Sequence, residues 1–283
     1  MRVAAKALLQ DNGIDLLTEG LISSYLPEGR AGSLIVLDSV DSTNNYLKGL
    51  AAEGALSGTA VIADSQTSGK GRLGRSFLSP SGVGIYLSYL FRPESGFENI
   101  SNLTGWVSVA VADALKSACG IEPQLKWVND LLINRKKICG ILTEGFASKE
   151  SDHIDNCIIG IGINVNETHF PEELSAIASS IAMENNGQLF DRSVISAELI
   201  KALDALSMEW PSSPYYLNRY RELSITVGSD IAVFPRMLEN GQERTGKALA
   251  INEDFSLKVR FEDGTTEDVR SGEVSVRGLY GYS

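Results

Sequence analysis

The sequence predicts an α+β fold in which a large domain of helices and short strands is followed by a small all-β domain. Apolar residues recur at helical spacing in several segments, and strand-like patterns lie between these segments. The clearest helix is expected over 101–118, where Gly120 follows as a C-terminal cap. Helical periodicity ends at Leu223, so the remaining residues form only short strands separated by turns.

The large domain is expected to begin with a strand at 34–37, followed by a helix that Asp41 to Asn44 cap and that runs to about Ala55. Residues 65–82 read as a long loop. Further strands are predicted at 59–64, 84–91, 125–127, 131–134, 138–146 and 157–165, and further helices at 172–183, 193–210 and 215–223.

The last part of the chain predicts a small barrel, because its strands are too short and too few for a large sandwich. These strands are expected at 231–234, 246–251, 257–261, 265–269 and 274–276. The resulting domains are a short lead-in segment at 1–30, a main domain at 31–224 and a barrel at 225–283.

Composition excludes several classes of protein. The chain has 25 Lys and Arg against 36 Asp and Glu, a net charge of −11, which argues against general nucleic-acid binding. Three separated cysteines fit neither a disulfide framework nor a zinc ribbon, and a reducing compartment is expected. Without a long apolar run or a signal-peptide core, the sequence predicts a cytoplasmic protein that does not span a membrane.

The two histidines, His153 and His169, lie in polar segments without a catalytic motif around them. We therefore expect the chemistry to depend on lysine, arginine, carboxylates or groups of the substrate itself.

The segment from Gln66 to Ser76 concentrates glycines and cations in an otherwise acidic chain. Glycines let backbone N–H groups approach a ligand closely, and the cations can neutralise an anion held there. An anionic ligand is the functional interpretation, and a solvated surface loop is the alternative. The segment is not a P-loop, because Arg75 occupies the Walker lysine position and no helix follows.

Three other motifs are ambiguous when each is taken alone. Lys126 ends a predicted strand in K-W-V-N-D, where it is either an inward anion ligand or a solvent-facing lysine. The D-S-T-N run at Asp41 fits a helix cap. Gly160 and Gly162 form a G-x-G inside a strand, which is weak evidence for a dinucleotide site.

Taken together and in order, the motifs resemble those of the biotin protein ligase family over residues 38–277. The matching motifs are D-S-T-N, Q-T-S-G-K-G-R-L-G-R, K-W-V-N-D, G-I-L-T-E, I-G-I-G-I-N-V-N and G-E-V-S-V-R. The resemblance implies a mixed-sheet catalytic domain like those of class II aminoacyl-tRNA synthetases, followed by an SH3-like barrel. It also implies that biotin is activated by ATP, with Mg²⁺, and transferred to a lysine on the biotin carboxyl carrier domain of a carboxylase.

The same resemblance assigns residues to roles. Lys126 and Arg72 would be catalytic, and no metal ligands are assigned. The expected biotin-binding residues are Ser42, Thr43, Asn44, Gln66, Lys70, Gly71, Arg72 and Lys126. The expected nucleotide-binding residues are Arg75, Lys137, Asn164 and Arg277. Departures from the family pattern are Lys70 in place of Arg, Val128 in place of Pro and Phe77 in place of a frequent Trp.

Two alternative functions remain open at this point. One is a lipoate or octanoate ligase, which would need a long apolar channel. The other is a non-catalytic biotin sensor that regulates transcription; the acidic charge and the short segment 1–30 argue against it, and autonomous DNA binding is not expected. A homodimer is left open.

Overall fold

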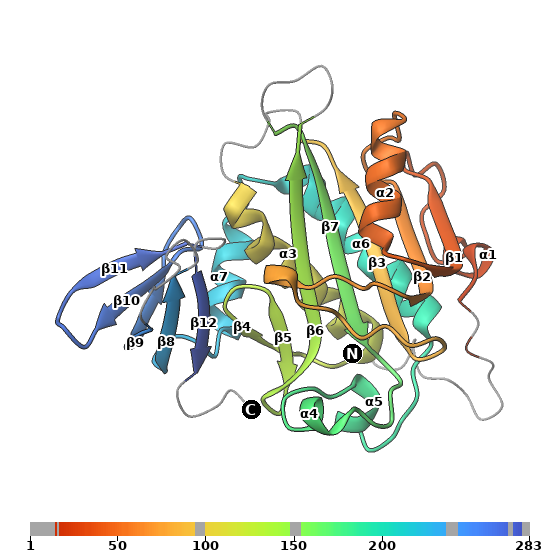
Figure 1. The fold of residues 1–283 in the computed structure, drawn as a ribbon. Coiled ribbons are helices and arrows are strands. Elements are labelled where there is room, and N and C mark those ends of the chain that lie inside the picture. Colours follow the sequence, from red (N-terminus) through yellow and green to blue (C-terminus); the bar gives the residue numbers. More distant parts are fainter. Residues whose placement is uncertain are drawn as a thin grey trace.

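The main domain is built on a seven-stranded mixed sheet. The computed structural model describes residues 15, 17–93, 100–147, 154–235, 243–270 and 274–278. The strand order is β1-β2-β3-β7-β6-β5-β4, in which β1 pairs with β2 in parallel and the other neighbours are antiparallel (Figure 1). The strands are β1 Leu34–Val40, β2 Ala60–Gln66, β3 Gly84–Phe91, β4 Gln124–Lys126, β5 Asp130–Ile133, β6 Lys136–Phe146 and β7 Asn156–Asn164.

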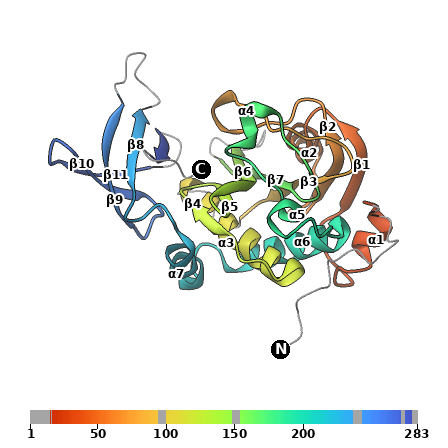
Figure 2. The ribbon, with the colours of Figure 1, turned by 90° about the horizontal axis from the view of Figure 1, so that it is seen from below.

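Helices cover the two faces of this sheet unequally. On one face α3 (Ile100–Cys119) and α6 (Arg192–Glu209) pack over the large core, and α2 (Thr43–Ala52) packs on the other face (Figure 2). The alternation of side chains along a strand explains this division, because Val61 packs under α2 whereas Ile62 belongs to the core under α3 and α6. Since α2 is short, part of its face of the sheet is left for a cavity.

One predicted helix, 172–183, is wrong as a continuous element. The chain forms two short helices there, α4 (Glu172–Ser175) and α5 (Ile181–Glu184). Between them the backbone pairs with the start of β6: the Lys137 N–H donates to Ile177 O and the Ser179 N–H donates to Lys137 O, each at 2.9 Å. Tertiary pairing therefore overrides the local helical pattern.

The other helices are α1 (Glu19–Ser23) and α7 (Pro214–Leu223). The helix α1 falls within the predicted lead-in segment, most of whose first sixteen residues lie outside the described part of the chain. The predicted loop 65–82 contains a 3-10 turn, η1 (Arg72–Gly74), and β2 extends two residues further into it than expected.

The carboxy-terminal strands form a second, antiparallel sheet in the order β11-β10-β9-β8-β12. These strands are β8 Asp230–Pro235, β9 Arg244–Ile251, β10 Leu257–Phe261, β11 Thr266–Val269 and β12 Val274–Gly278. The α+β prediction with a small SH3-like domain is confirmed, and the exact domain boundaries stay predictions.

The turn before β10 attaches this second sheet to the main domain. Phe255 packs beside Trp106 of α3, and its carbonyl accepts a 2.9 Å hydrogen bond from Trp127 Nε1. A side chain at Gly105 would meet the Phe255 ring at 2.1 Å, so the glycine permits this close approach. The tryptophan of the K-W-V-N-D motif is thus a structural contact between the two sheets.

Candidate active site

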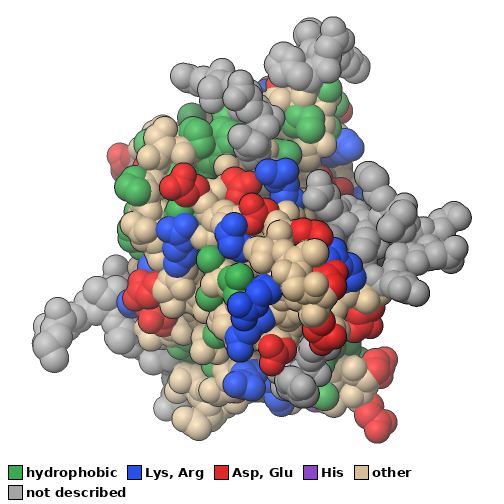
Figure 3. Space-filling view, turned by 90° about the vertical axis from the view of Figure 1, so that its left-hand side faces the viewer, with side chains coloured by type: hydrophobic (Ala, Val, Ile, Leu, Met, Phe, Trp, Pro, Cys, Tyr) green, Lys and Arg blue, Asp and Glu red, His purple; other side chains and the backbone are tan. Residues whose placement is uncertain are grey.

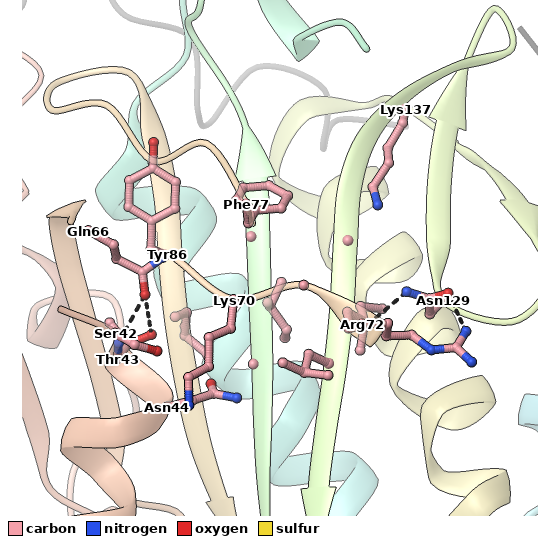
Figure 4. Close-up of a pocket in the computed structure, with 18 residues that line it drawn as sticks. Ser42, Thr43, Asn44, Gln66, Lys70, Arg72, Phe77, Tyr86, Asn129 and Lys137 are labelled. Atoms are coloured by element: carbon pink, nitrogen blue, oxygen red, sulfur yellow. Dashed lines mark hydrogen bonds between the residues drawn. The ribbon is translucent and has the colours of Figure 1, made fainter. Parts of the chain in front are cut away.

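A cavity lies on the α2 side of the main sheet, between the amino end of α2 and the basic loop (residues 66–77). Residues of α2, the basic loop and the main sheet surround it (Figure 4). Its lining residues are Ser42, Thr43, Asn44, Gln66, Lys70, Gly71, Arg72, Phe77, Tyr86, Leu87, Asn129, Lys137, Gly140, Ile141, Leu142, Gly160, Ile161 and Gly162.

Three glycines on β6 and β7 form part of the sheet surface beneath the cavity. A Cβ atom at Gly160 would lie 2.4 Å from Asn44 Oδ1, and one at Gly162 would lie 2.6 Å from the Phe77 ring. At Gly140 it would lie 3.0 Å from Lys137 Nζ. These distances mean that the side chains of Asn44, Phe77 and Lys137 lie directly over the glycines, so the glycines make room for the side chains that shape the cavity.

One end of the cavity, beside the amino end of α2, is lined mainly by hydroxyl and amide groups. Gln66 Oε1 accepts from the Thr43 backbone N–H at 2.9 Å, while Gln66 Nε2 donates to Ser79 Oγ at 2.9 Å. The Ser88 hydroxyl lies beneath, 2.8 Å from Thr43 Oγ1 and 2.5 Å from Asn44 Oδ1. Such a constellation of hydroxyls and amides suits a small ligand that carries both donors and acceptors.

The other end is cationic. Arg72 Nη1 donates to Asn129 Oδ1 at 2.8 Å, and Lys137 Nζ lies 2.7 Å from Asp130 Oδ1. Figure 4 shows that Arg72 and Lys137 lie on this side of the cavity. Lys70 also lines the cavity but extends to the opposite end beside α2, where its Nζ donates to Asn45 Oδ1 at 2.5 Å. The end with Arg72 and Lys137 is built to receive an anion.

The basic loop is held in a hairpin-like turn by its own backbone. The Gly71 N–H donates to Arg75 O at 2.7 Å, and the Phe77 N–H donates to Gly69 O at 2.8 Å. Gly74 has a φ of +72°, a left-handed conformation that glycine adopts without strain. The turn carries Arg72 toward the sheet and leaves Arg75 exposed.

The structure brings together eight of the residues expected from the sequence, namely Ser42, Thr43, Asn44, Gln66, Lys70, Gly71, Arg72 and Lys137. Three others do not line this cavity. Lys126 is partly buried at the end of β4, Arg75 faces a neighbouring hollow beyond the loop, and Asn164 donates from Nδ2 to Ser179 O at 2.9 Å. Arg277 has its backbone in β12, and its side chain lies outside the described part of the structure.

Sequence reasoning gave no role to several lining residues, among them Tyr86, Asn129, Gly140 and the ring of Phe77. Their signals are weak, because an aromatic residue in a strand usually packs in a core and Asn129 reads as a turn residue. Gly160 and Gly162 did carry a signal. They lie two residues apart on one strand, so both leave the same face of the sheet without side chains.

A buried network of charged side chains lies beside the start of β3, the strand that carries the cavity residue Tyr86. Arg192, 2% exposed, lies 2.6 Å from Asp15 Oδ2 and 2.7 Å from Asp64 Oδ1. Burial opposes ionisation of Asp64, but hydrogen bonds from Ser81 and Arg192 outweigh it and lower the Asp64 pKa. Asp64 thereby holds the turn through Ser81 that precedes β3 and its cavity residue Tyr86.

Cysteine and histidine, which often act as nucleophiles or bases in enzymes, are not among the residues that line the cavity. Cys139 and Cys157 are buried, and burial raises the pKa of both thiols. His169 is exposed, and His153 lies outside the described residues. Within the described ranges, no group of three or more His, Cys, Asp or Glu could hold a metal ion. Among the same residues, no helix has the length and apolar character needed to cross a bilayer.

Acidic and basic side chains are interspersed on the face seen in Figure 3. On the second sheet they form local pairs, such as Arg244 with Glu267 at 2.8 Å and Lys258 with Asp268 at 3.1 Å. These exposed pairs neutralise one another locally rather than creating a basic surface.

The comparisons agree with the fold and the cavity. Residues 36–164 match the model of the Biotin/lipoate A/B protein ligase family. The match covers the main sheet with both ends of the cavity, and it defines the class of the chain as a ligase of the biotin and lipoate type.

Individual relatives narrow this class. The "Bifunctional ligase/repressor BirA" of Bacillus spizizenii is 36% identical, over 82% of this chain and 70% of the relative. The "Biotin--[acetyl-CoA-carboxylase] ligase" of Mycobacterium tuberculosis is 31% identical, over 85% of this chain and 88% of the relative. The biotin protein ligase of Aquifex aeolicus, solved with biotin and ATP, superposes with a TM-score of 0.74 at 33% identity, covering 87% of this chain and 99% of that one. The chain therefore belongs to the biotin protein ligase family, and it is an ATP-dependent ligase.

Proposed function

We propose that this chain activates biotin with ATP to form biotinyl-5′-AMP and then transfers biotin to a lysine of a biotin carboxyl carrier domain. The observation that carries the proposal is the polarity of one cavity, with uncharged hydrogen-bonding groups at Thr43 and Gln66 and cations at Arg72 and Lys137. Biotin has the same polarity, a ureido ring at one end and a carboxylate at the other.

In the first step, a biotin carboxylate oxygen attacks the α-phosphorus of ATP, and pyrophosphate leaves with the bonding electron pair. Negative charge grows on the phosphate oxygens as the new bond forms, so cations already in place lower the barrier. Arg72 and Lys137 line the side of the cavity where carboxylate and phosphate would meet, and Lys70 lines the cavity beside α2. Lys126 stays a candidate for contact with the reacting groups, and Arg75, Asn164 and Arg277 stay candidates for the nucleotide side.

Magnesium would arrive with ATP, held mostly by phosphate oxygens. Asp130 fits a supporting role because its carboxylate lies beside Lys137, at the cationic end of the cavity. When bound, the ion would neutralise phosphate charge.

In the second step, the neutral amine of the acceptor lysine attacks the carbonyl carbon of the adenylate, and AMP leaves with the electron pair. The amide forms without a covalent enzyme intermediate. Relatives whose names include acetyl-CoA-carboxylase, such as that of Mycobacterium tuberculosis, support a carrier domain as the acceptor. We propose a cytoplasmic protein, since three separated cysteines are typical of a reducing compartment.

Pyrophosphate release on mixing enzyme, Mg²⁺-ATP and either biotin or lipoate tests the first step. We expect release with biotin and little with lipoate, and transfer of labelled biotin to a carrier domain in a second assay. Release with lipoate alone would favour the lipoate-ligase alternative. Binding of biotin without any release would favour the non-catalytic sensor, which a DNA mobility-shift assay would then examine.

A further inference from the structure

A short linker (residues 224–229) joins α7 to β8 and lies between the two sheets. The edge strand β4 is on the side of the main sheet nearest the second sheet (Figures 1 and 2). The Ile225 N–H donates to Leu125 O in β4 at 3.0 Å, and the Gly228 N–H donates to Ala248 O in β9 at 2.8 Å. The linker therefore pairs with one strand of each sheet.

Thr226 in this linker contacts the turn that follows β4. Its Oγ1 accepts a hydrogen bond from the Trp127 backbone N–H at 2.8 Å. Thr226 is 0% and Trp127 4% exposed, so the hydroxyl takes the place of water as the acceptor for this N–H. We propose that Thr226 is a positioning residue, which holds the turn of residues 127–129 so that Asn129 docks Arg72 at the cationic end of the cavity. The inference rests on the proposed function and deepens it, because it concerns how the adenylate is retained.

The turn of residues 127–129 connects β4 to β5, and each of its three residues is hydrogen-bonded to a different element. The linker holds the first residue, α3 holds the second and β6 holds the third. These bonds run from the Trp127 N–H to Thr226 Oγ1 at 2.8 Å, from Ser108 Oγ to Val128 O at 3.1 Å and from the Ile141 N–H to Asn129 O at 3.0 Å. The bond to Thr226 fixes the point at which the chain leaves β4.

Asn129 connects this turn to the basic loop, because its Oδ1 accepts from Arg72 Nη1 at 2.8 Å. A buried N–H that loses its acceptor is costly, so without the hydroxyl of Thr226 the backbone at Trp127 should shift toward another partner. The shift would pass along two residues to Asn129, and a hydrogen bond weakens steeply once its distance and angle change. Arg72 would then sample more conformations, of which fewer face an anion in the cavity. Thr226 acts in this way without lining the cavity.

Two substitutions separate the hydroxyl from the shape of the side chain. Thr226→Val keeps the shape and removes the acceptor, whereas Thr226→Ser keeps the hydroxyl. We expect biotinyl-AMP to dissociate about tenfold faster from Thr226→Val, less than the roughly 10²-fold that a 1 Å misplacement can cost, because α3 and β6 still hold the turn. Thr226→Ser should stay within about threefold of the parent, because the Trp127 N–H keeps its acceptor.

Thr59→Val is the matched control. Thr59 is another buried threonine, 2% exposed, whose Oγ1 donates to Leu56 O at 2.8 Å. It precedes β2, at the end of that strand opposite the cavity residue Gln66. Both Thr59→Val and Thr226→Val should lower the melting temperature, because each leaves a buried backbone group without its hydroxyl partner. Only Thr226→Val should release the adenylate faster.

The measurements are thermal melting and the dissociation rate of labelled biotinyl-AMP. Supplying labelled biotinyl-AMP directly makes the test independent of the rate at which it forms. In the double variant with Arg72→Ala, Thr226→Val should add almost nothing to the dissociation rate, because its effect passes through Arg72. If Thr226→Val loses cooperative melting, Thr226→Ala also removes the acceptor and carries the same expectation.

Dissociation from Thr226→Val at the parent rate, or full additivity with Arg72→Ala, would overturn the inference. Equal acceleration in Thr59→Val would also overturn it, since a general loss of stability would then be the cause. The same holds if Thr226→Ser accelerates dissociation as much as Thr226→Val does. These failures differ from a failure of the proposed function, in which the parent protein itself would not form biotinyl-AMP from biotin and ATP.

Discussion

Arg72 of the basic loop is hydrogen-bonded to Asn129 at the turn between β4 and β5, with 2.8 Å between Nη1 and Oδ1. Asn129 is itself oriented, because its Nδ2 donates to Ile141 O at 3.0 Å. The loop cation is therefore docked on the sheet by an amide whose direction is fixed. This contact connects the two motifs that the sequence suggested for anion binding.

We expect Arg72→Ala to weaken retention of the adenylate strongly, because one cation of the cationic end is removed. The cost to folding should be about 1 kcal/mol, that of a single partly exposed hydrogen bond. The control is Lys247→Ala, which deletes an exposed cation of β9 that does not line the cavity. Dissociation rates of labelled biotinyl-AMP and thermal melting check both expectations. Equal retention in the two variants would remove the special role of Arg72.

Lys137→Gln and Lys126→Gln form a second matched pair. Of these two lysines, only Lys137 lines the cavity. Deletion of its charge should therefore slow single-turnover adenylation by roughly 10²-fold, the scale of losing one well-placed electrostatic donor. Lys126→Gln tests the assignment made from the sequence, and because Lys126 does not line the cavity we expect a smaller loss. A larger loss in Lys126→Gln would mean that ligand binding brings Lys126 to the reacting atoms.

Much of the fold could be predicted, because most helices and strands lie where the local pattern of apolar residues predicts them. The helix over Ile100–Cys119 and the strand Gly84–Phe91 appear close to where periodicity put them. The helix predicted over 172–183 failed because Ser179 pairs with Lys137, a residue far away in the sequence. No local pattern contains that contact.

The site was predictable where its residues are unusual in composition, as at Lys70 and Arg72. It was not predictable where a common residue gains a role from its neighbours. Thr226 stands between a helix and a strand with no special spacing, and only the fold brings it to Trp127. Likewise the sequence assigned catalysis to Lys126 and only nucleotide binding to Lys137, whereas Lys137 lines the cavity and Lys126 does not, because their positions depend on how β4, β5 and β6 pair.

The glycines beneath the cavity give a third prediction. Gly162→Ala would place a methyl group 2.6 Å from the Phe77 ring, so either the ring or the ligand must move. We expect biotin affinity to fall about tenfold or more while the protein remains folded. Gly49→Ala, in α2 with no atom within 4 Å of the added carbon, is the control. Calorimetric titration with biotin measures both, and unchanged affinity in Gly162→Ala would show that the ligand does not lie over these glycines.

The last prediction concerns Glu167, which follows β7 and is 5% exposed. Neither of its carboxyl oxygens has a hydrogen-bond partner among the described residues. Burial raises the pKa of Glu167 to about 8, despite the nearby positive charge of Arg192. The unfolded chain releases this proton near pH 4.5, its ordinary value, so between these two pH values the folded state holds a proton that the unfolded state has lost.

The free energy of unfolding should therefore fall as pH rises from about 4.5 to 8, by at most roughly 1.4 kcal/mol per pH unit from this group. Glu167→Gln resembles the protonated acid and should remove that slope, which makes the variant more stable than the parent at pH 8.5 and nearly equal to it at pH 5. Urea unfolding at the two pH values measures the difference. Exposed Glu173→Gln is the control and should follow the parent. A parallel decline in parent and Glu167→Gln would show that Glu167 is ionised in the folded protein across this range and that another group causes the pH dependence.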